Sequence, residues 1–133
     1  MKFYSPLRYP GGKSKLVPFV KLLITKAHSE CSTYIEPFAG GAGIALALLL
    51  EGVVEKITVN DYDKAIYSVW RAIKSEPLKL IKLIIETPID INEWHKQRNI
   101  YNCTRGYSVE LAFAALFLNR VNRSGIITGG PIA

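Results

Sequence analysis

The chain has 133 residues and a formal net charge of +6, with 49% of its residues hydrophobic and 21% charged. This balance excludes a disordered chain and is typical of one modest globular domain. The basic excess favours a polyanionic partner, because clustered Lys and Arg neutralise phosphates, although a solvated basic surface without a partner fits the composition too.

Cysteine and histidine are too sparse and too scattered to suggest a metal site. Cys31 and Cys103 form no Cys-x-x-Cys pair, and His28 and His95 are isolated. We therefore expect no structural zinc and no disulfide framework, as in a reducing cytoplasm. No apolar run approaches the ~20 residues that span a bilayer, and no signal-peptide core is present, so the sequence predicts a soluble cytoplasmic protein without a membrane partner.

The first third of the chain alternates between turn signals and regular elements. Residues 5–13 read SPLRYPGGK, which is rich in turn formers, and a helix is expected to follow with Pro18 in its first turn. Residues 33–36 are predicted to form a strand that ends at a cluster of glycines within residues 40–43. The apolar run after this cluster predicts a second helix, stopped by Gly52.

The rest of the chain predicts one more strand and then a helical block. Residues 56–60, KITVN, alternate and are β-branched, which is typical of a strand. The last helix should end near Asn119, and the tail beyond it is predicted to be a turn and the first arm of a hairpin. Four helices should follow the second strand, each opened by a capping residue or a proline: Asp63, Pro77, Asn92 and Ser108.

Two parallel strands cannot bury both faces of a doubly wound sheet. We therefore expect either that more of the sheet lies beyond residue 133 or that another chain completes it.

The strongest local signal is a strand, a glycine turn and a helix over residues 33–49. Glycines let a ligand approach the backbone closely, and the N–H groups of the following helix favour an electronegative ligand. Asp61 follows the second strand, where a carboxylate can hold ribose hydroxyls, although Asp61 and Asp63 compete for this role and for helix capping. The pattern predicts a nucleoside-containing cofactor in a Rossmann-like half, while the glycine cluster alone would be a weak signal.

Two phosphate-binding motifs do not fit. The stretch GGKS at residues 11–14 resembles the end of a phosphate-binding loop, but Leu7 stands where that loop needs its first glycine. A dinucleotide motif could start at Gly41 and Gly43, but Leu46 replaces its third small residue. A dinucleotide cofactor is therefore not expected.

Four sequence blocks, in order and at matching spacing, resemble the Dam-like adenine-specific DNA methyltransferases: RYPGGK (8–13), EPFAGGAG (36–43), VNDYD (59–63) and FLNRVNRSGI (117–126). The resemblance implies an α/β fold, a partial Rossmann-like S-adenosylmethionine-dependent methyltransferase core with a helical target-recognition insertion. It assigns residues 1–75 to the cofactor-binding part and residues 76–133 to the helical start of the target-recognition region, within a single compact but incomplete unit.

The resemblance also implies which residues bind S-adenosylmethionine. The ring of Tyr9 would pack on the cofactor, and Lys13 would place its charge near the methionine carboxylate. Asp61 would hold the ribose hydroxyls, and Tyr62 would flank the adenine. Five consecutive residues match the motif that wraps the methionine moiety: Glu36, Pro37, Phe38, Ala39 and Gly40.

For DNA, the family places a basic residue that contacts DNA at the position of Arg8. Arg120 lies at the entry to the recognition hairpin, where a DNA contact and a structural salt bridge are equal alternatives. Arg123 replaces an aromatic found in some relatives, so a phosphate contact fits it better than wedging between bases. Other residues at this entry and on the first arm are Asn122, Ser124, Ile126 and Thr128. Trp70 and Trp94 are expected to serve packing rather than base stacking.

The implied activity is methyl transfer from S-adenosylmethionine to the N6 amino group of adenine in duplex DNA, with a role in restriction–modification, self-protection or epigenetic marking. The family's catalytic Asp-Pro-Pro-Tyr does not occur in the sequence, so the chain is expected to be truncated before this motif and inactive alone. Self-association or a complementing C-terminal half would then be its protein partners. The alternatives are a non-catalytic DNA-binding fragment, one half of a split methyltransferase, or an enzyme acting on cytosine N4.

Overall fold

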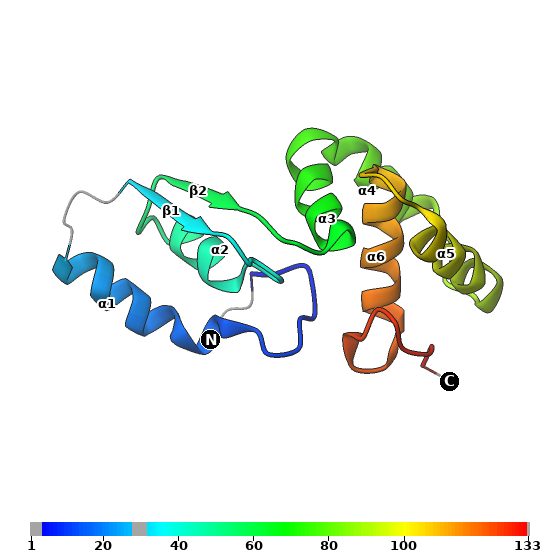
Figure 1. The fold of residues 1–133 in the computed structure, drawn as a ribbon, viewed down its shortest axis with the longest axis horizontal. Helices are drawn as coiled ribbons and strands as arrows, with labels where there is room; N and C mark the ends of the chain where they lie inside the picture. Colours follow the sequence, from blue (N-terminus) through cyan, green and yellow to red (C-terminus); the bar gives the residue numbers. More distant parts are fainter. Residues whose placement is uncertain (1–3, 28–31, 133) are drawn as a thin grey trace. The chain divides into compact units, whose positions relative to one another are not determined.

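The structure is a computed structural model that describes residues 4–27 and 32–132. The described residues form a mixed α/β structure with six α-helices, two strands and two short 3-10 helices (Figure 1). His28 and Cys31 lie outside the described residues. None of the helices in the described ranges is long and apolar enough to cross a membrane.

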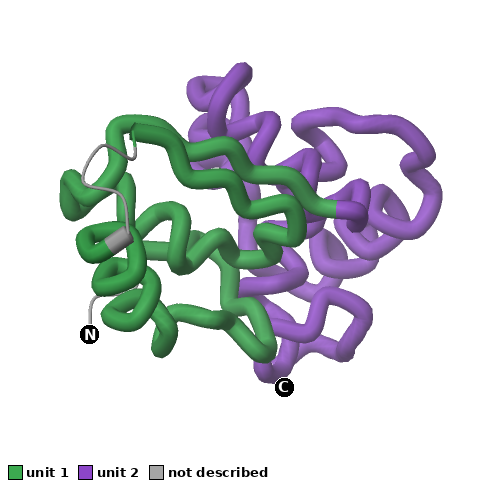
Figure 2. The backbone as a smooth tube through the Cα atoms, turned by 60° about the vertical axis from the view of Figure 1, so that its left-hand side comes forward, with its two compact units in different colours: residues 1–61 green, residues 62–133 purple. Residues whose placement is uncertain are grey.

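The chain divides into two compact units, which Figure 2 shows in different colours. We refer to Met1–Asp61 as the sheet unit and to Tyr62–Ala133 as the helical unit. This division falls earlier than the predicted boundary between residues 75 and 76, and it replaces the predicted single unit with two. The physical reason is the packing of helix α3 (Lys64–Ser75), which contacts α6 (Val109–Val121) of the helical block.

The sheet unit is built on two parallel strands, β1 (Thr33–Glu36) and β2 (Lys56–Val59), as predicted. Tyr34 pairs with Ile57 and Glu36 pairs with Val59, so these four side chains share one face of the sheet. The opposite face carries Ile35, which is 63% exposed. The pair of strands confirms the α/β class at its coarsest level, whereas a complete Rossmann-like sheet is not present within the described residues.

Helices α1 (Val17–Ala27) and α2 (Gly43–Leu50) lie on the same side of the two strands (Figure 1). Ile44, Leu48 and Val54 form the centre of the core, against which residues of α1 and of both strands pack. Pro18 is the second residue of α1, as predicted, and α2 ends just before Gly52, whose φ of 69° is left-handed. The apolar spacing therefore predicts this half of the structure correctly.

The helical unit is arranged around α6, the most apolar of its helices. Buried side chains cover most of α6, and Phe113 and Phe117 place their ring centroids 5.9 Å apart. Three helices contact α6: α3, α4 (Pro77–Glu86) and α5 (Ile91–Cys103). A helix that is apolar on nearly all sides is stable in water only when other helices surround it.

Side-chain caps begin three of the four helices. Asp63 accepts bonds from the N–H groups of Ala65 (2.8 Å) and Ile66 (3.2 Å) at the start of α3. Ser108 accepts a bond from Leu111 N–H (3.0 Å) at the start of α6, and Pro77 is the first residue of α4, all as predicted. The cap predicted at Asn92 is wrong, because Asp90 has the extended backbone of a cap and its carboxylate accepts a bond from the Glu93 N–H (2.8 Å).

The tail differs from its prediction as well. Helix α6 continues to Val121, two residues beyond the predicted end, and a 3-10 turn, η2 (Arg123–Gly125), follows. The chain then folds back through an isolated antiparallel bridge between Asn122 and Pro131. A short closed loop therefore stands where the first arm of a hairpin was predicted. Ser124 and Gly125 allow the sharp turn with left-handed φ values of 57° and 72°.

Replacing Asp63 with Ala should lower the free energy of unfolding by about 1 kcal/mol, because two N–H groups of α3 lose their acceptor. Urea unfolding followed by circular dichroism measures this change. Asp63→Asn is the matched control, since Asn caps helices as well as Asp and should leave the stability nearly unchanged. Equal losses in both variants would show that the carboxylate acts through its charge and not as a cap.

Candidate functional site

The glycine turn between β1 and α2 lies at the carboxyl ends of both strands. The strand pairing continues beyond the strands, with Asn60 N–H donating to the carbonyl of Glu36 (3.0 Å) and Ala39 N–H donating to the carbonyl of Asn60 (2.9 Å). Asn60 also donates from its side chain to the carbonyl of Pro37 (3.3 Å). The turn is thus held to the end of β2 by a row of backbone bonds. Asn60 was not singled out from the sequence, although its place beside Asp61 was a usable signal.

Asp61 makes the most direct link to this turn. Its Oδ2 accepts a hydrogen bond from the N–H of Gly40 at 2.7 Å. Gly40 has a left-handed φ of 49°, which glycine adopts without strain because it has no Cβ atom. The carboxylate therefore stabilises the unusual backbone of the turn while lying at the tip of the second strand, where the sequence predicted a ribose-binding acid.

The ring of Tyr9 covers the glycine turn. A Cβ atom built on Gly40 would lie 2.8 Å from Cε1 of Tyr9, closer than any real contact, so the ring occupies the space that a side chain at position 40 would need. A Cβ on Gly41 would lie 3.1 Å from Cβ of the same tyrosine. Tyr9 remains 44% exposed, so part of the ring faces solvent. These contacts bring the N-terminal loop and the glycine turn together within the sheet unit.

Glu36 lies beneath the turn and is only 7% exposed. Its Oε2 accepts a hydrogen bond from the N–H of Ala45 in the first turn of α2 (3.2 Å). Burial raises the pKa of Glu36 above its ordinary 4.5, and the Ala45 bond and the charge of Lys13 offset part of this rise. Lys13, itself exposed, thus acts electrostatically on the buried carboxylate.

The other residues predicted for the cofactor are arranged differently. Ala39 is buried at 6% exposure, whereas Phe38 is 74% exposed and Pro37 is exposed as well. Tyr62 is 92% exposed and is the first residue of the helical unit. The sheet unit therefore gathers five predicted residues around the turn: Tyr9, Lys13, Glu36, Gly40 and Asp61.

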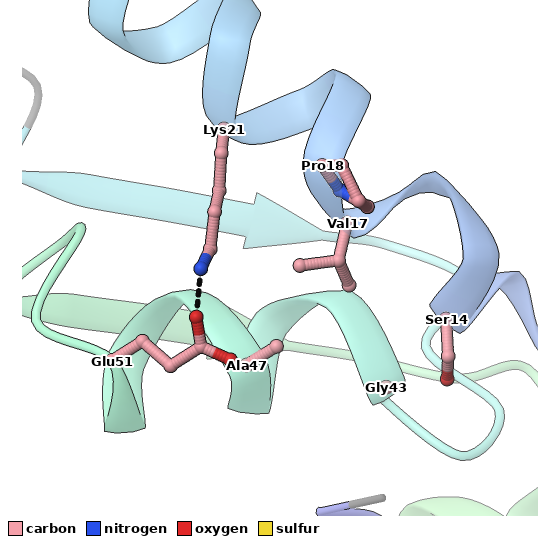
Figure 3. A pocket seen from close by; sticks show the side chains of 7 residues that line it. All are labelled: Ser14, Val17, Pro18, Lys21, Gly43, Ala47 and Glu51. Atoms are coloured by element: carbon pink, nitrogen blue, oxygen red, sulfur yellow. Dashed lines mark ion pairs between the residues drawn. The ribbon is translucent and has the colours of Figure 1, made fainter. Parts of the chain in front are cut away.

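A separate pocket of about 240 Å³ lies between α1 and α2 (Figure 3). Lys21 and Glu51 form an ion pair across it, and Ser14 lies so close to Gly43 that a Cβ there would collide with its hydroxyl. None of the residues predicted for the cofactor lines this pocket. The pair joins the two helices at a half-exposed position, where ion pairs contribute little to stability.

The residues predicted to contact DNA fall in both units. Arg8 is exposed in the sheet unit, and Arg120, Arg123 and Ser124 are exposed at the end of α6 and in the turn after it. Asn122 is the exception, because its side chain is fully buried. The prediction that Asn122 touches DNA does not agree with this burial, and the residue holds the loop together instead.

Trp70 and Trp94 are both buried, in agreement with the packing roles predicted for them. The indole Nε1–H of Trp94 donates a hydrogen bond to Oδ1 of Asn122 at 2.7 Å. The guanidinium carbon of Arg98 lies 4.9 Å from the centroid of the Trp94 ring, a cation–π contact. Among the described residues, no group of three or more His, Cys, Asp and Glu side chains could hold a metal ion.

Comparison with known proteins matches residues 9–127 to the family of D12 class N6 adenine-specific DNA methyltransferases. Over 77 residues the chain is 30% identical to the type II methyltransferase M1.LlaDCHI of Lactococcus lactis subsp. cremoris, covering 58% of this chain and 25% of that relative. Over 90 residues it is 30% identical to the modification methylase StsI of Streptococcus sanguinis, covering 68% of this chain and 12% of that relative. The chain therefore spans a small part of the relatives it matches.

The pH dependence of stability should report the buried carboxylate. Because burial raises the pKa of Glu36 in the folded state, its contribution to stability is complete in acid and is lost as the pH rises through that pKa. Glu36→Gln keeps an acceptor for Ala45 but carries no charge, so its stability should rise relative to the wild type between about pH 4 and about pH 7.

Urea unfolding of both proteins at the two pH values measures this difference. Glu55→Gln, at an exposed glutamate of the same unit, should show no comparable trend. A Glu36→Gln variant that loses stability relative to the wild type as the pH rises would mean that the bonds to the charged carboxylate outweigh its burial.

Proposed function

Because the chain belongs to the D12 class N6 adenine-specific DNA methyltransferases, we propose that its sheet unit binds S-adenosylmethionine for methyl transfer to adenine N6 in duplex DNA. The similarity to a type II methyltransferase and to a modification methylase supports a role in restriction–modification. The single observation that carries the proposal is the bond from Gly40 N–H to Asp61 Oδ2 beneath the ring of Tyr9.

This arrangement suits a nucleoside cofactor for three reasons. Ligands of open α/β sheets bind at the carboxyl ends of the strands, which is where the turn and Asp61 lie. The left-handed glycine leaves room for the Tyr9 ring, whose solvent-facing part can pack on a ligand. A carboxylate accepts several hydrogen bonds at once, so Asp61 can bind the turn and receive bonds from ribose hydroxyls together.

We assign the remaining cofactor contacts by chemistry. Lys13 is exposed and can pair with the methionine carboxylate, and the solvent-facing part of the Tyr9 ring can pack on the ligand. The residues from Glu36 to Gly40 would surround the methionine moiety, with the Glu36 carboxylate supporting the helix start from below. Tyr62, highly exposed, would flank the adenine.

For DNA we propose phosphate contacts from exposed basic residues: Arg8, Arg120 and Arg123, together with the hydroxyl of Ser124.

The methyl transfer itself needs acceptors that hold the amino group of a flipped adenine while its nitrogen attacks the sulfonium methyl. The sequence contains no Asp-Pro-Pro-Tyr to supply them, so we expect the 133-residue chain to bind without transferring methyl groups. A complementing C-terminal half, supplied in the same or another chain, would provide these acceptors.

Two other functions remain candidates. A DNA-binding fragment with a vestigial cofactor pocket agrees with the net charge of +6 and with the exposed arginines, and it requires no cofactor affinity. A methyltransferase acting on cytosine N4 would bind the same cofactor, and transfer assays on the completed enzyme would separate it from an adenine enzyme.

Calorimetric titration with S-adenosylmethionine and S-adenosylhomocysteine should show saturable binding to the wild-type chain. Asp61→Ala should weaken both ligands by about 10-fold to 100-fold, because hydrogen bonds to a charged group and the shape of the turn are lost together. Asp63→Asn is the matched control, since Asp63 caps α3 and should not affect the ligand. Absence of binding by the folded wild-type chain would favour the DNA-binding fragment.

Binding of a labelled duplex should fall steeply with salt, and Arg123→Ala should lower the magnitude of the slope of log affinity against log salt by about 1. Fluorescence anisotropy at several salt concentrations measures this slope. Lys82→Ala, at another exposed cation of the helical unit, serves as the control. An unchanged slope in Arg123→Ala would exclude a phosphate contact by this side chain.

A further inference from the structure

The loop after α6 is closed by its own backbone. Arg123 N–H donates to the carbonyl of Gly130 (3.1 Å), and Ile132 N–H donates to the carbonyl of Val121 (3.0 Å), so both ends of the loop are tied together. Inside it, Gly129 N–H donates to the carbonyl of Ile126 (2.9 Å). The carbonyl groups of Ile127 and Gly129 accept none of these bonds, and that of Ile126 can accept a second one.

The side chain of Asn122 supplies a donor to these carbonyl groups. Its Nδ2 lies within hydrogen-bonding distance of the carbonyl oxygens of Ile126 (3.0 Å), Ile127 (2.8 Å) and Gly129 (3.2 Å). Its Oδ1 accepts the bond from Trp94, and the residue is fully buried. One side chain thus joins three points of the loop to the first turn of α5.

The polarity of these bonds determines which residue can occupy position 122. An indole N–H can only donate and a carbonyl oxygen can only accept, so the amide oxygen must face Trp94 and the amide nitrogen must face the loop. Asp has the same shape but would place an oxygen against three carbonyl oxygens in a buried site. Asn119 adds a parallel bond from its Nδ2 to the carbonyl of Gly125 (2.8 Å).

The loop presents polar and apolar side chains to solvent next to this buried centre. The exposed residues are Arg123, Ser124, Ile126 and Thr128. Because Arg123 directly follows Asn122, the backbone direction of the arginine depends on the bonds that the asparagine makes. A long, flexible cation gains affinity for a phosphate when its backbone is held in the bound geometry beforehand.

We infer that Asn122 and Trp94 are positioning residues that preorganise the loop of residues 123–131 for DNA, so that α5 controls the placement of Arg123. This inference rests on the proposed function, because it assigns the loop's exposed face to DNA. Neither residue touches DNA itself. Their effect on affinity passes through Arg123 and its neighbours on the loop.

A double-mutant cycle on the full 133-residue chain tests this. Trp94→Phe keeps an aromatic ring and removes the N–H donor without changing charge, and it should weaken binding of a labelled 20-base-pair duplex by about fivefold. Arg123→Ala should weaken binding by a similar factor. In the double variant Trp94→Phe should add little beyond Arg123→Ala, because the contact that it positions is already gone.

Asn122→Asp provides a second cycle if Trp94→Phe does not fold, as judged by circular dichroism. Asn99→Asp, at an exposed amide of α5, introduces the same charge and controls for general repulsion of DNA. In a Trp70→Phe background Trp94 is the remaining tryptophan, so its emission should change little on adding the duplex, because the loop is already held in place, whereas it should be shifted in Asn122→Asp without DNA.

The outcomes separate the inference from the proposed function. If the loss of affinity in the double variant equals the product of the two single losses, Trp94 and Arg123 act independently. This result would overturn the positioning role while leaving DNA binding in place. An unchanged affinity in a folded Trp94→Phe would overturn it as well. If the folded wild-type chain does not bind the duplex at low salt, the proposed DNA contact fails, and the inference fails with it.

Discussion

The hydrogen bond from Gly40 to Asp61 is the constraint on which the candidate site depends. It holds a left-handed backbone against the end of β2, and the Tyr9 ring lies against the turn in this conformation. Without this bond, the glycine turn would be free to adopt other conformations, and the N-terminal loop would lose the surface on which it rests. The buried carboxylate of Glu36 supports the same turn from the side of α2.

In the helical unit, the amide side chain of Asn122 shapes a loop in a comparable way. The central helix α6 is buried by three neighbours, so the chain that leaves it must turn sharply to reach the surface. The buried side chain of Asn122 bonds to the loop carbonyls and gives the buried Trp94 indole N–H its acceptor. In both units, a polar side chain at the end of a regular element determines the shape of the loop beside it.

Sequence reasoning predicted the local elements well, because apolar spacing and capping chemistry act over a few residues. The strand at residues 33–36, the cap at Asp63 and the helix opened by Pro77 all follow from such short-range rules. The boundary of the two units was missed, since α3 is assigned by its packing on α6, which no local pattern reveals. Asn122 was expected among the DNA-binding residues beside Arg123, because an asparagine in a polar stretch gives no sign of burial until its partner, Trp94 on another helix, is known.

The close approach of Tyr9 to Gly40 has a consequence for how related sequences can vary. A side chain at position 40 would enter the space of the tyrosine ring and would also have to adopt a left-handed backbone. A relative that lacks glycine there therefore needs a smaller or displaced side chain at the position of Tyr9, or a turn of different length. Substitutions at these two positions, more than two dozen residues apart in the chain, should be coupled across the family rather than independent.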